Sequence, residues 1–450
     1  MSAVLTFGTD GVRGPANAGC LTPENVTRLG FAAGMVLRTE HPACTPLVLI
    51  GRDTRISGLM LENALAAGLQ SAGIDIARLG VIPTPGVAAL VRGGNALAGA
   101  VISASHNPAG DNGIKFFGPD GYKLSDEIEA AIEQSFVNGT DVGRAEMPGS
   151  EREVELPVEL YLNHARRAFP QDLNLQGIKL VVDGANGAAC VAAPAMFREL
   201  QAEVICIACD GDGARINAAC GSTHPHALCE AVVREGAAVG VAFDGDADRL
   251  LLVDETGSPL DGDELLAIAA LDMLKRKKLT DGLLVATVMS NFGLNTLLES
   301  QGGRLARTAV GDRNVIHEMR AQNAALGGEQ SGHVIFHEHS TTGDGLVSAL
   351  EILAIVRRSG RPLSELRRVL KKSPQAQRNI ALVSRPPLES VPGFSETKAA
   401  VECELGAAGR LLVRYSGTET KVRILVEGPD EAIVAAHADR LAACFAKLQR

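Results

Sequence analysis

The sequence predicts an α/β protein: three similar α/β segments with mixed, largely parallel sheets, followed by a smaller α+β segment. Short apolar runs alternate with helical patterns from the N-terminus to about residue 370, as they do in α/β units. Beyond that point, three short strand patterns and one long helical pattern follow instead. A chain of 450 residues with 46% hydrophobic residues can form several such cores.

Four domains are predicted, at residues 1–153, 154–256, 257–370 and 371–450. The first boundary falls in residues 139–153, where the helical periodicity is lost and the chain becomes polar. The last boundary falls at residues 371–378, a polar stretch with a proline that we interpret as a hinge.

The elements follow from hydrophobic periodicity and from start signals. Thr22 before Pro23 is typical of a helix start. In the first domain, strands are predicted at 47–50, 74–79 and 98–102, and helices at 57–72 and 125–136. In the second and third, strands are predicted at 179–182, 203–208, 238–243, 283–288 and 305–309, and helices at 193–200, 263–275 and 345–358. In the fourth, strands at 380–383, 410–413 and 423–426 precede a helix at 430–447. No repeat of fixed period is visible.

The composition argues against several classes of function. A net charge of −10 and the absence of tryptophan disfavour binding to nucleic acid or to an anionic membrane. No apolar run approaches the roughly 18 residues of a membrane span, and no secretory signal is recognisable, so we expect a cytoplasmic protein. We interpret the C-x-x-C pair of Cys206 and Cys209 as reduced buried thiols rather than a zinc site, because no second close pair follows.

The most informative motif is residues 102–115, I-S-A-S-H-N-P-A-G-D-N-G-I-K, which follow a predicted buried strand. Open α/β sheets bind their ligands at the carboxyl ends of strands. Ser105 is therefore a candidate nucleophile, with His106 and Lys115 as candidate proton carriers on the same loop. Taken alone, the stretch also fits a polar turn, because its Asn-Pro and Asn-Gly pairs favour turns.

A second motif, D-G-D-A-D-R at 244–249, alternates three carboxylates between two predicted apolar strands. Two such charges about 4 Å apart repel by roughly 4 kcal/mol at an effective dielectric near 20. A hard divalent cation such as Mg²⁺, which prefers oxygen ligands, would remove that repulsion. An EF-hand calcium loop fits poorly, because Arg249 stands where glycine is needed and a strand follows. A solvated acidic turn is the other alternative.

Two further loops combine glycines with hydrogen-bonding groups. Residues 327–333, G-G-E-Q-S-G-H, suit adjacent sugar hydroxyls, with a hairpin-like turn as the alternative. Residues 414–420, R-Y-S-G-T-E-T, with Arg423 beyond them, suit a dianionic phosphate, with a Ser/Gly turn and surface arginines as the alternative. His337 and His339 could share a strand face as metal ligands, but we interpret them as ordinary strand residues.

Together with F-G-T-D-G-V-R-G at 7–14, these four loops resemble the α-D-phosphohexomutase superfamily over essentially the whole chain. Further matching pieces are D-N-G-I-K-F-F, T-V-M-S-N-F-G-L at 287–294, V-G-D-R at 310–313, G-E-Q-S-G-H and T-T-G-D-G at 341–345. The resemblance implies three related α/β domains and a smaller fourth domain around a central cleft. It is strongest to superfamily members that act on glucosamine phosphate.

The resemblance also implies roles for single residues. The implied catalytic residues are Ser105 as a phosphoserine, His106, Lys115, Arg249 and Arg13. The implied metal ligands are Ser105, Asp244, Asp246 and Asp248. The implied substrate-binding residues are Glu329, Ser331, His333, Arg414, Ser416, Gly417, Thr418 and Arg423. Two positions depart from the family pattern, Ala247 for glycine and Thr420 for proline, and neither removes a reacting group.

The implied reaction interconverts D-glucosamine 6-phosphate and D-glucosamine 1-phosphate through a phosphoserine and a bisphosphorylated sugar. It would feed UDP-N-acetylglucosamine and cell-wall synthesis, with Mg²⁺ and a sugar 1,6-bisphosphate as cofactors and a homodimer as the assembly. Three alternatives stay open: a phosphomannomutase or phosphoglucomutase, a Mg²⁺-dependent sugar-phosphate phosphatase, and a catalytically silent sugar-phosphate sensor. The intact Ser105, Lys115 and three aspartates argue against the sensor.

Overall fold

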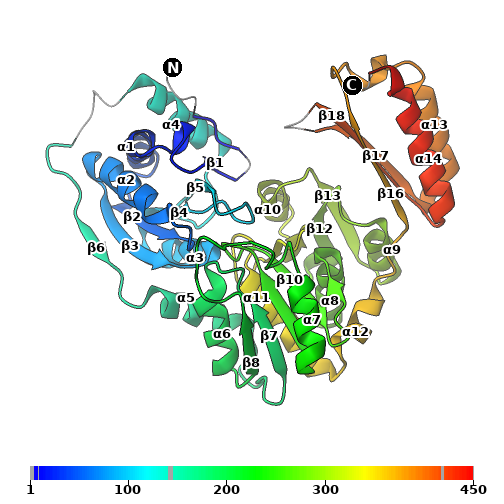
Figure 1. Cartoon of the computed structure of the whole chain (residues 1–450), viewed down its shortest axis with the longest axis horizontal. Coiled ribbons are helices and arrows are strands. Elements are labelled where there is room, and N and C mark those ends of the chain that lie inside the picture. Colours follow the sequence, from blue (N-terminus) through cyan, green and yellow to red (C-terminus); the bar gives the residue numbers. More distant parts are fainter. Residues whose placement is uncertain (1–4, 9, 140–144, 417–419, 449–450) are drawn as a thin grey trace. The chain divides into compact units, whose positions relative to one another are not determined.

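The computed structural model describes residues 5–8, 10–139, 145–416 and 420–448, and its four sheets follow one another along the chain (Figure 1). The chain divides into two compact units. The first holds residues 1–287 and 306–368, and the second holds 288–305 and 369–450. The predicted α/β class with mixed, largely parallel sheets and an α+β C-terminal part is confirmed.

The first sheet has the strand order β1-β5-β4-β2-β3-β6. Its strands are β1 (Val12–Pro15), β2 (Thr45–Arg52), β3 (Asp75–Val81), β4 (Ala96–Ile102), β5 (Asp111–Phe117) and β6 (Glu151–Glu153). Strands β3, β2 and β4 run parallel, and β5 is antiparallel to both β4 and β1. The short β6 pairs with β3 inside residues 139–153, where we placed the first domain boundary, so the end of that polar stretch is a strand.

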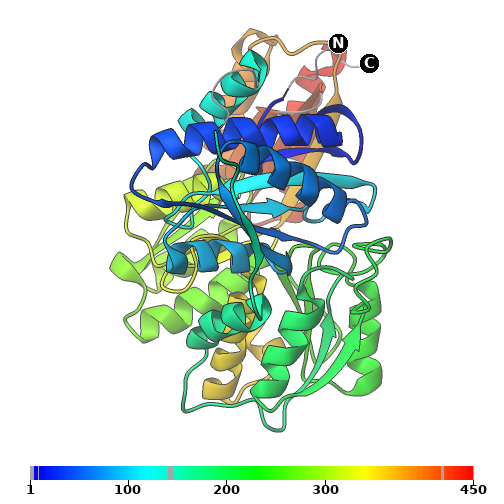
Figure 2. The same ribbon diagram turned by 90° about the vertical axis from the view of Figure 1, so that its left-hand side faces the viewer.

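Helices cover both faces of this sheet. They are α1 (Pro23–Glu40), α2 (Gly58–Ser71), α3 (Thr84–Gly94) and α4 (Asp126–Asn138). The predicted start of α1 is confirmed, since the Thr22 hydroxyl caps the helix and Pro23 is its first residue. Val48 and Ile50 of β2 pack into one core with α1, α2 and α4, and Gly51 faces Val87 of α3 on the other side. In Figure 2, α1 crosses in front of the strands.

The second and third sheets have the orders β11-β10-β9-β7-β8 and β13-β12-β14-β15. Their strands are β7 (Lys179–Asp183), β8 (Glu203–Ile207), β9 (Val239–Phe243), β10 (Leu250–Asp254), β11 (Pro259–Leu260), β12 (Leu283–Thr287), β13 (Arg304–Thr308), β14 (Leu326–Gly328) and β15 (Val334–Phe336). Their helices are α5 (Pro157–Ala165), α6 (Ala189–Glu199), α7 (His226–Glu235), α8 (Gly262–Lys275), α9 (Phe292–Ser300), α10 (Asp312–Ala321), α11 (Gly345–Ser359) and α12 (Leu363–Leu366).

The same strand order occurs in all three sheets: β5-β4-β2-β3, β10-β9-β7-β8 and β15-β14-β12-β13. In each sheet a parallel strand (β4, β9 or β14) is followed directly by an antiparallel partner. Each of the first three predicted functional loops joins such a pair of strands. Three equivalent hairpins therefore carry three different sets of polar residues.

The second unit contains an antiparallel sheet of order β16-β18-β17, with β16 (Gln375–Ala381), β17 (Arg410–Tyr415) and β18 (Lys421–Glu427). Helices α13 (Phe394–Leu405) and α14 (Glu431–Cys444) lie side by side on one face of it (Figure 1). Strand β16 begins inside the predicted hinge, so the second half of that stretch is regular structure. No helix in the described part of the chain is both long enough and apolar enough to span a bilayer.

Candidate active site

The serine loop, which we define as residues 103–110 together with Asp111, the first residue of β5, joins β4 to β5 and places Ser105 against the second sheet's hairpin. Ser105 is buried and has a φ of 50°, in the left-handed region that serine rarely adopts. Its Oγ donates a hydrogen bond of 2.7 Å to Oδ2 of Asp244 and lies 3.2 Å from Nδ1 of His106. The candidate nucleophile therefore touches both an aspartate and an imidazole.

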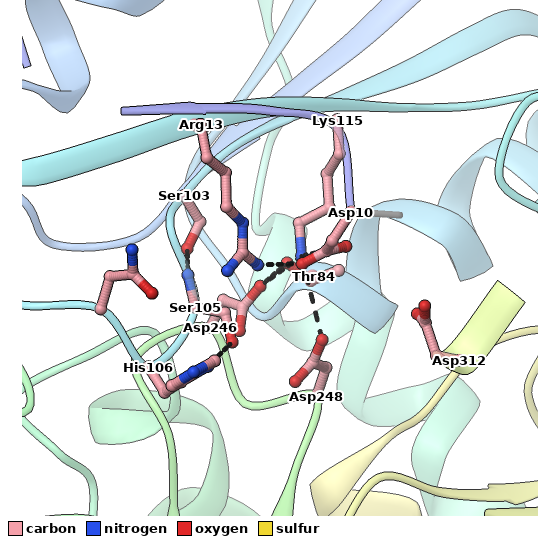
Figure 3. Close-up of polar contacts among 12 residues, drawn as sticks. Asp10, Arg13, Thr84, Ser103, Ser105, His106, Lys115, Asp246, Asp248 and Asp312 are labelled. Atoms are coloured by element: carbon pink, nitrogen blue, oxygen red, sulfur yellow. Dashed lines mark hydrogen bonds and ion pairs between the residues drawn. The ribbon is translucent and has the colours of Figure 1, made fainter. Parts of the chain in front are cut away.

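Lys115 lies within strand β5, opposite Val101, and not on the loop where we predicted it. Its Nζ is 2.7 Å from Oδ2 of Asp246, 3.4 Å from the Asp10 carboxylate and 3.9 Å from Oδ2 of Asp248. Figure 3 shows the side chain pointing from its strand towards these carboxylates. Burial lowers the pKa of Lys115, but the surrounding carboxylates outweigh burial and raise it, so the ammonium keeps its proton.

The aspartate loop, residues 244–249, is the hairpin between β9 and β10. Ala247, where the family pattern has glycine, adopts a left-handed φ of 61°, and its N–H donates to the Asp244 carbonyl at 3.1 Å. The loop turns its three carboxylates towards one point. One oxygen from each of Asp244, Asp246 and Asp248 lies within 4.8 Å of the other two.

These three buried carboxylates fit a divalent cation. Burial, Asp248 and Asp246 together raise the pKa of Asp244, which shows how poorly protein groups alone compensate the charge. One oxygen of Asp246 and one of Asp248, both Oδ1, are buried without a hydrogen-bond partner among the described residues. Carboxylate oxygens that converge on one point are the ligands that a hard cation prefers.

Two arginines and one neutral imidazole lie next to Ser105. Burial lowers the pKa of His106 to about 4, and the charges of Arg249 and Arg13 act in the same direction, so His106 is neutral at pH 7. The backbone N–H of Arg249 donates to Oδ1 of Asp244 at 3.2 Å, and the Arg13 guanidinium pairs with Asp10. The surroundings of the serine hydroxyl therefore combine positive charge with a proton acceptor.

The sugar loop, residues 327–333, is the hairpin between β14 and β15, and its first two glycines belong to β14 rather than to the loop as we predicted. Glu329 accepts a hydrogen bond of 3.0 Å from the N–H of Gly311, and Ser331 is exposed. His333 is buried, with Nδ1 3.8 Å from Oδ2 of Asp248. Its Nε2 lies 2.9 Å from the backbone nitrogen of Gly343. Burial lowers the pKa of His333, but the neighbouring carboxylates, Asp248 above all, outweigh burial and raise it to about 9.

The third hairpin also joins the second through its backbone. The N–H of Leu250, the first residue of β10, donates to the Gly332 carbonyl at 3.0 Å. The serine, aspartate and sugar loops thus form one continuous polar region within the first unit.

The predicted phosphate-binding residues belong to the second unit, in which Arg414 and Arg423 face each other across β17 and β18. Arg423 Nη2 lies 3.5 Å from Oγ of Ser416. Burial and the neighbouring Arg423 lower the pKa of Arg414, as expected for two adjacent cations that an anion would stabilise. Gly417 and Thr418 lie outside the described residues.

The two histidines that we did not predict as ligands face different partners. His337 Nε2 is 2.7 Å from the hydroxyl of Tyr122, and His339 Nε2 is 3.2 Å from Glu351. They share no metal-binding geometry. Within the described residues, the aspartate loop forms the one cluster of three or more potential ligands.

The structure adds polar residues that the sequence did not single out. Thr84, at the start of α3, donates to Oδ2 of Asp246 at 2.7 Å. Lys123 contacts both Asp10 and Asp312, the first residue of α10, which links the first and third α/β segments. Asp10 lies in the same glycine motif as Arg13, so that motif could have identified Asp10 as a site residue. Thr84 and Lys123 lie in no motif.

Known protein families and relatives match almost the whole length of this chain. The phosphoglucomutase/phosphomannomutase alpha/beta/alpha domain models I, II and III match residues 4–142, 159–257 and 261–373, and the C-terminal domain model matches 354–443. The phosphoglucosamine mutase of Syntrophotalea carbinolica is 49% identical over 439 residues, covering 97% of this chain and 96% of that protein. That of Gluconacetobacter diazotrophicus is 49% identical and covers 95% and 94%.

Solved structures share the fold. A phosphoglucomutase/phosphomannomutase family protein from Burkholderia thailandensis superposes with a TM-score of 0.82 at 25% identity, covering 99% of this chain and 97% of that one. N-acetylphosphoglucosamine mutase from Aspergillus fumigatus, in complex with GlcNAc-6P and magnesium, gives a TM-score of 0.67 at 16% identity, covering 99% and 96%. Together with the four domain matches, these full-length similarities show that the chain belongs to the phosphoglucomutase/phosphomannomutase family of α-D-phosphohexomutases.

Proposed function

We propose that the chain interconverts D-glucosamine 6-phosphate and D-glucosamine 1-phosphate by way of a phosphoserine at position 105. The observation that carries the proposal is the 2.7 Å contact of Ser105 Oγ with the first of three buried carboxylates, the second of which contacts Lys115. The choice of the amino sugar is supported by the nearly full-length relatives, which are phosphoglucosamine mutases.

In the first half-reaction, the bond between phosphorus and Ser105 Oγ breaks and a bond to the free sugar hydroxyl forms. The hydroxyl gives up a proton, and Oγ takes one. Lys115 carries a proton that neighbouring carboxylates hold in place, and His106 is neutral, so the pair can supply one proton and accept the other. The bisphosphorylated sugar then turns over and returns its other phosphoryl group to Oγ.

Asp244, Asp246, Asp248 and a phosphoserine oxygen would hold Mg²⁺. When bound, Mg²⁺ neutralises negative charge on the transferring phosphoryl group. Arg249 and Arg13, whose charges already act on His106, would bind oxygens of the phosphoserine.

Magnitudes indicate which contributions dominate. General acid–base catalysis contributes typically about 10²–10⁴-fold, whereas phosphate-monoester chemistry requires acceleration of up to about 10²¹-fold. Positioning and charge stabilisation must therefore account for most of the rate. Such a dominant role of positioning agrees with a site whose described polar side chains are mostly buried and contact one another.

For the substrate, Glu329, Ser331 and His333 would bind the sugar. Arg414, Ser416, Gly417, Thr418 and Arg423 would bind the phosphate that is not transferred. A sugar 1,6-bisphosphate would prime Ser105. We keep the four-domain division at 153, 256 and 370, a homodimer and a cytoplasmic reaction as parts of this proposal, and the charge of −10 supports the expectation that nucleic acid is not a partner.

The test is the mutase rate of the purified protein with Mg²⁺ and trace sugar bisphosphate. Glucosamine 6-phosphate, glucose 6-phosphate and mannose 6-phosphate are compared by kcat/KM. We expect a preference for the amino sugar and a loss of about 10⁴-fold or more in Ser105→Ala. The exposed Ser359→Ala is the control and should match the wild type.

The other outcomes separate the alternatives. A preference for a neutral hexose phosphate would keep the chemistry and change the substrate. Net release of inorganic phosphate without isomerisation would replace the mutase by a phosphatase. Full activity of Ser105→Ala would contradict the phosphoserine.

A further inference from the structure

Arg55 is a buried arginine that the proposed chemistry does not use. It lies in the motif G-R-D-T-R at 51–55, just after β2, and its side chain is 0% exposed. A fully buried guanidinium carries a large desolvation cost unless every donor is bound. The identity of its partners therefore indicates what it is for.

All five N–H donors of the guanidinium have acceptors, and four of these are carbonyls of the serine loop. Nη2 donates to the carbonyls of Ser105 and Asn107 at 2.9 and 2.8 Å. Nη1 donates to the carbonyls of Pro108 and Asp111, the latter at 2.9 Å. The fifth donor, Nε, is 2.9 Å from Oδ2 of Asp53. The serine loop is thus wrapped around one planar cation.

Asp53 restrains Ser105 on the side of its backbone N–H, through Ser103. Its Oδ2 accepts the Ser103 hydroxyl at 2.6 Å, and the Ser103 oxygen accepts the backbone N–H of Ser105 at 2.9 Å. Ser105 is therefore fixed through its N–H by Ser103, which Asp53 holds, and through its carbonyl by Arg55. A left-handed φ is unfavourable for a residue such as serine, and these bonds maintain it.

Asn217, from the second α/β segment, repeats part of this arrangement. Its Nδ2 donates to the same two carbonyls, of Ser105 at 2.9 Å and of Asn107 at 3.0 Å. The charge of Arg55 is balanced by Asp53, so the pair adds little net charge near the phosphoryl group. The contribution of Arg55 is therefore geometric.

We infer that Arg55 is a positioning residue that keeps Ser105 Oγ in one place while its covalent state changes. This rests on the function proposed above, in which Oγ leaves phosphorus in one half-reaction and attacks it in the other. Both steps need the same alignment with the carboxylates of the aspartate loop. A displacement of about 1 Å at a reacting atom can cost about 10²-fold in rate.

The test compares Arg55→Lys with Arg52→Lys. Lysine keeps the charge, but its three donors radiate from a single atom and cannot serve four carbonyls. We expect Arg55→Lys to lower kcat, and the single-turnover rate of phosphoryl transfer from isolated phosphoenzyme to glucosamine 6-phosphate, by about 10²-fold, with KM changed less than about threefold. Arg52, in the same motif, pairs with Glu62 and should tolerate lysine.

Melting temperatures of the variants and chemical rescue distinguish a positioning role of Arg55 from an effect on folding. Arg55→Ala should recover part of its single-turnover rate with added guanidinium chloride at millimolar, non-denaturing concentration, whereas added ammonium should have no effect. If Arg55→Lys does not fold, Asn217→Ala decides, with an expected loss of about tenfold in the single-turnover rate at unchanged KM.

A kcat of Arg55→Lys within twofold of wild type would overturn the inference, and so would an unchanged single-turnover rate in Asn217→Ala. These failures differ from failure of the proposed function, which would show as a wild-type protein that does not interconvert the sugar phosphates at all.

Discussion

The serine loop and the aspartate loop occupy the same position in two sheets that share a four-strand order, yet they are stabilised in opposite ways. Each contains a non-glycine residue in the left-handed region, Ser105 and Ala247. The serine loop has its carbonyls bound by the buried Arg55, whereas the aspartate loop leaves two carboxylate oxygens without hydrogen-bond partners among the described residues. The protein itself completes the first loop, and in the function that we propose a cation completes the second.

Removal of the divalent cation is the strongest test of this difference between the two loops. We expect chelation to lower mutase activity by at least about 10³-fold, because the three carboxylates then repel one another and the transferring charge is uncompensated. Mg²⁺ should restore activity, and at about 100 times its Kd it should stabilise the protein by about 2.7 kcal/mol.

The control for chelation is Asp246→Asn, whose melting temperature should respond little to Mg²⁺, while that of Arg52→Lys should respond as in wild type. Full activity in the chelated protein would show that the aspartate loop is complete without a cation and would remove the contrast between the loops.

The pH dependence of stability tests the buried carboxylate of Asp183, whose hydrogen bonds hold the segment that carries Asn217. Asp183, at the end of β7, accepts the N–H groups of Ala185 and Gly221 at 2.9 and 2.8 Å, and the Ala185 carbonyl accepts the N–H of Asn217. Burial outweighs these bonds and raises the pKa of Asp183 to about 6. The native state then holds this proton more tightly than the unfolded chain, whose aspartate pKa is about 3.9.

Stability from this group is therefore present below about pH 4 and is lost as the pH rises through about 6, by on the order of 3 kcal/mol. The measurement is the difference in melting temperature between wild type and Asp183→Asn from pH 4 to pH 7. We expect the difference to move in favour of the variant as the pH rises. A difference that stays constant with pH would contradict the raised pKa.

The smallest expected effect concerns Ala247. Glycine would relieve a left-handed conformation that costs alanine about 1–2 kcal/mol, but it would add about 0.4–1 kcal/mol of unfolded-state entropy. We expect Ala247→Gly to be stabilising by less than about 1 kcal/mol, with unchanged activity. The matched control is Ala130→Gly in α4, an exposed helical position, which should lose about 1 kcal/mol in thermal unfolding. A loss at both positions would show that the aspartate loop carries no strain at Ala247.

Local patterns predicted the strands that end at the site. The run 98–102 became β4 (Ala96–Ile102) and 238–243 became β9 (Val239–Phe243), because fully apolar runs are typical of strands buried on both faces. The position of Lys115 was predicted wrongly, because Asn112-Gly113 looks like a turn. Gly113 instead permits a close approach, since a β-carbon there would lie 2.6 Å from the Ser103 carbonyl.

Contacts between distant segments could not be predicted in this way. Thr84 and Asn217 reach Asp246 and Ser105 only after two sheets pack together, and neither lies in a periodic or motif-like stretch. Asp53 and Arg55 stood in a visible motif, but nothing local shows that the guanidinium faces four carbonyls. Such roles depend on tertiary structure, and a single sequence does not encode them as a pattern.

The recurrence of one strand order in three sheets has a consequence for how such a protein arises. Duplication of a single ancestral module would supply three copies of the same hairpin, all at the same edge of their sheets. Divergence then needed only to change the side chains of each turn: a serine in the first copy, aspartates in the second, a glutamate and a serine in the third. In the function that we propose, each copy has a separate role, so substitutions in the third hairpin would alter which sugar is accepted while the other two copies preserve the phosphoryl chemistry.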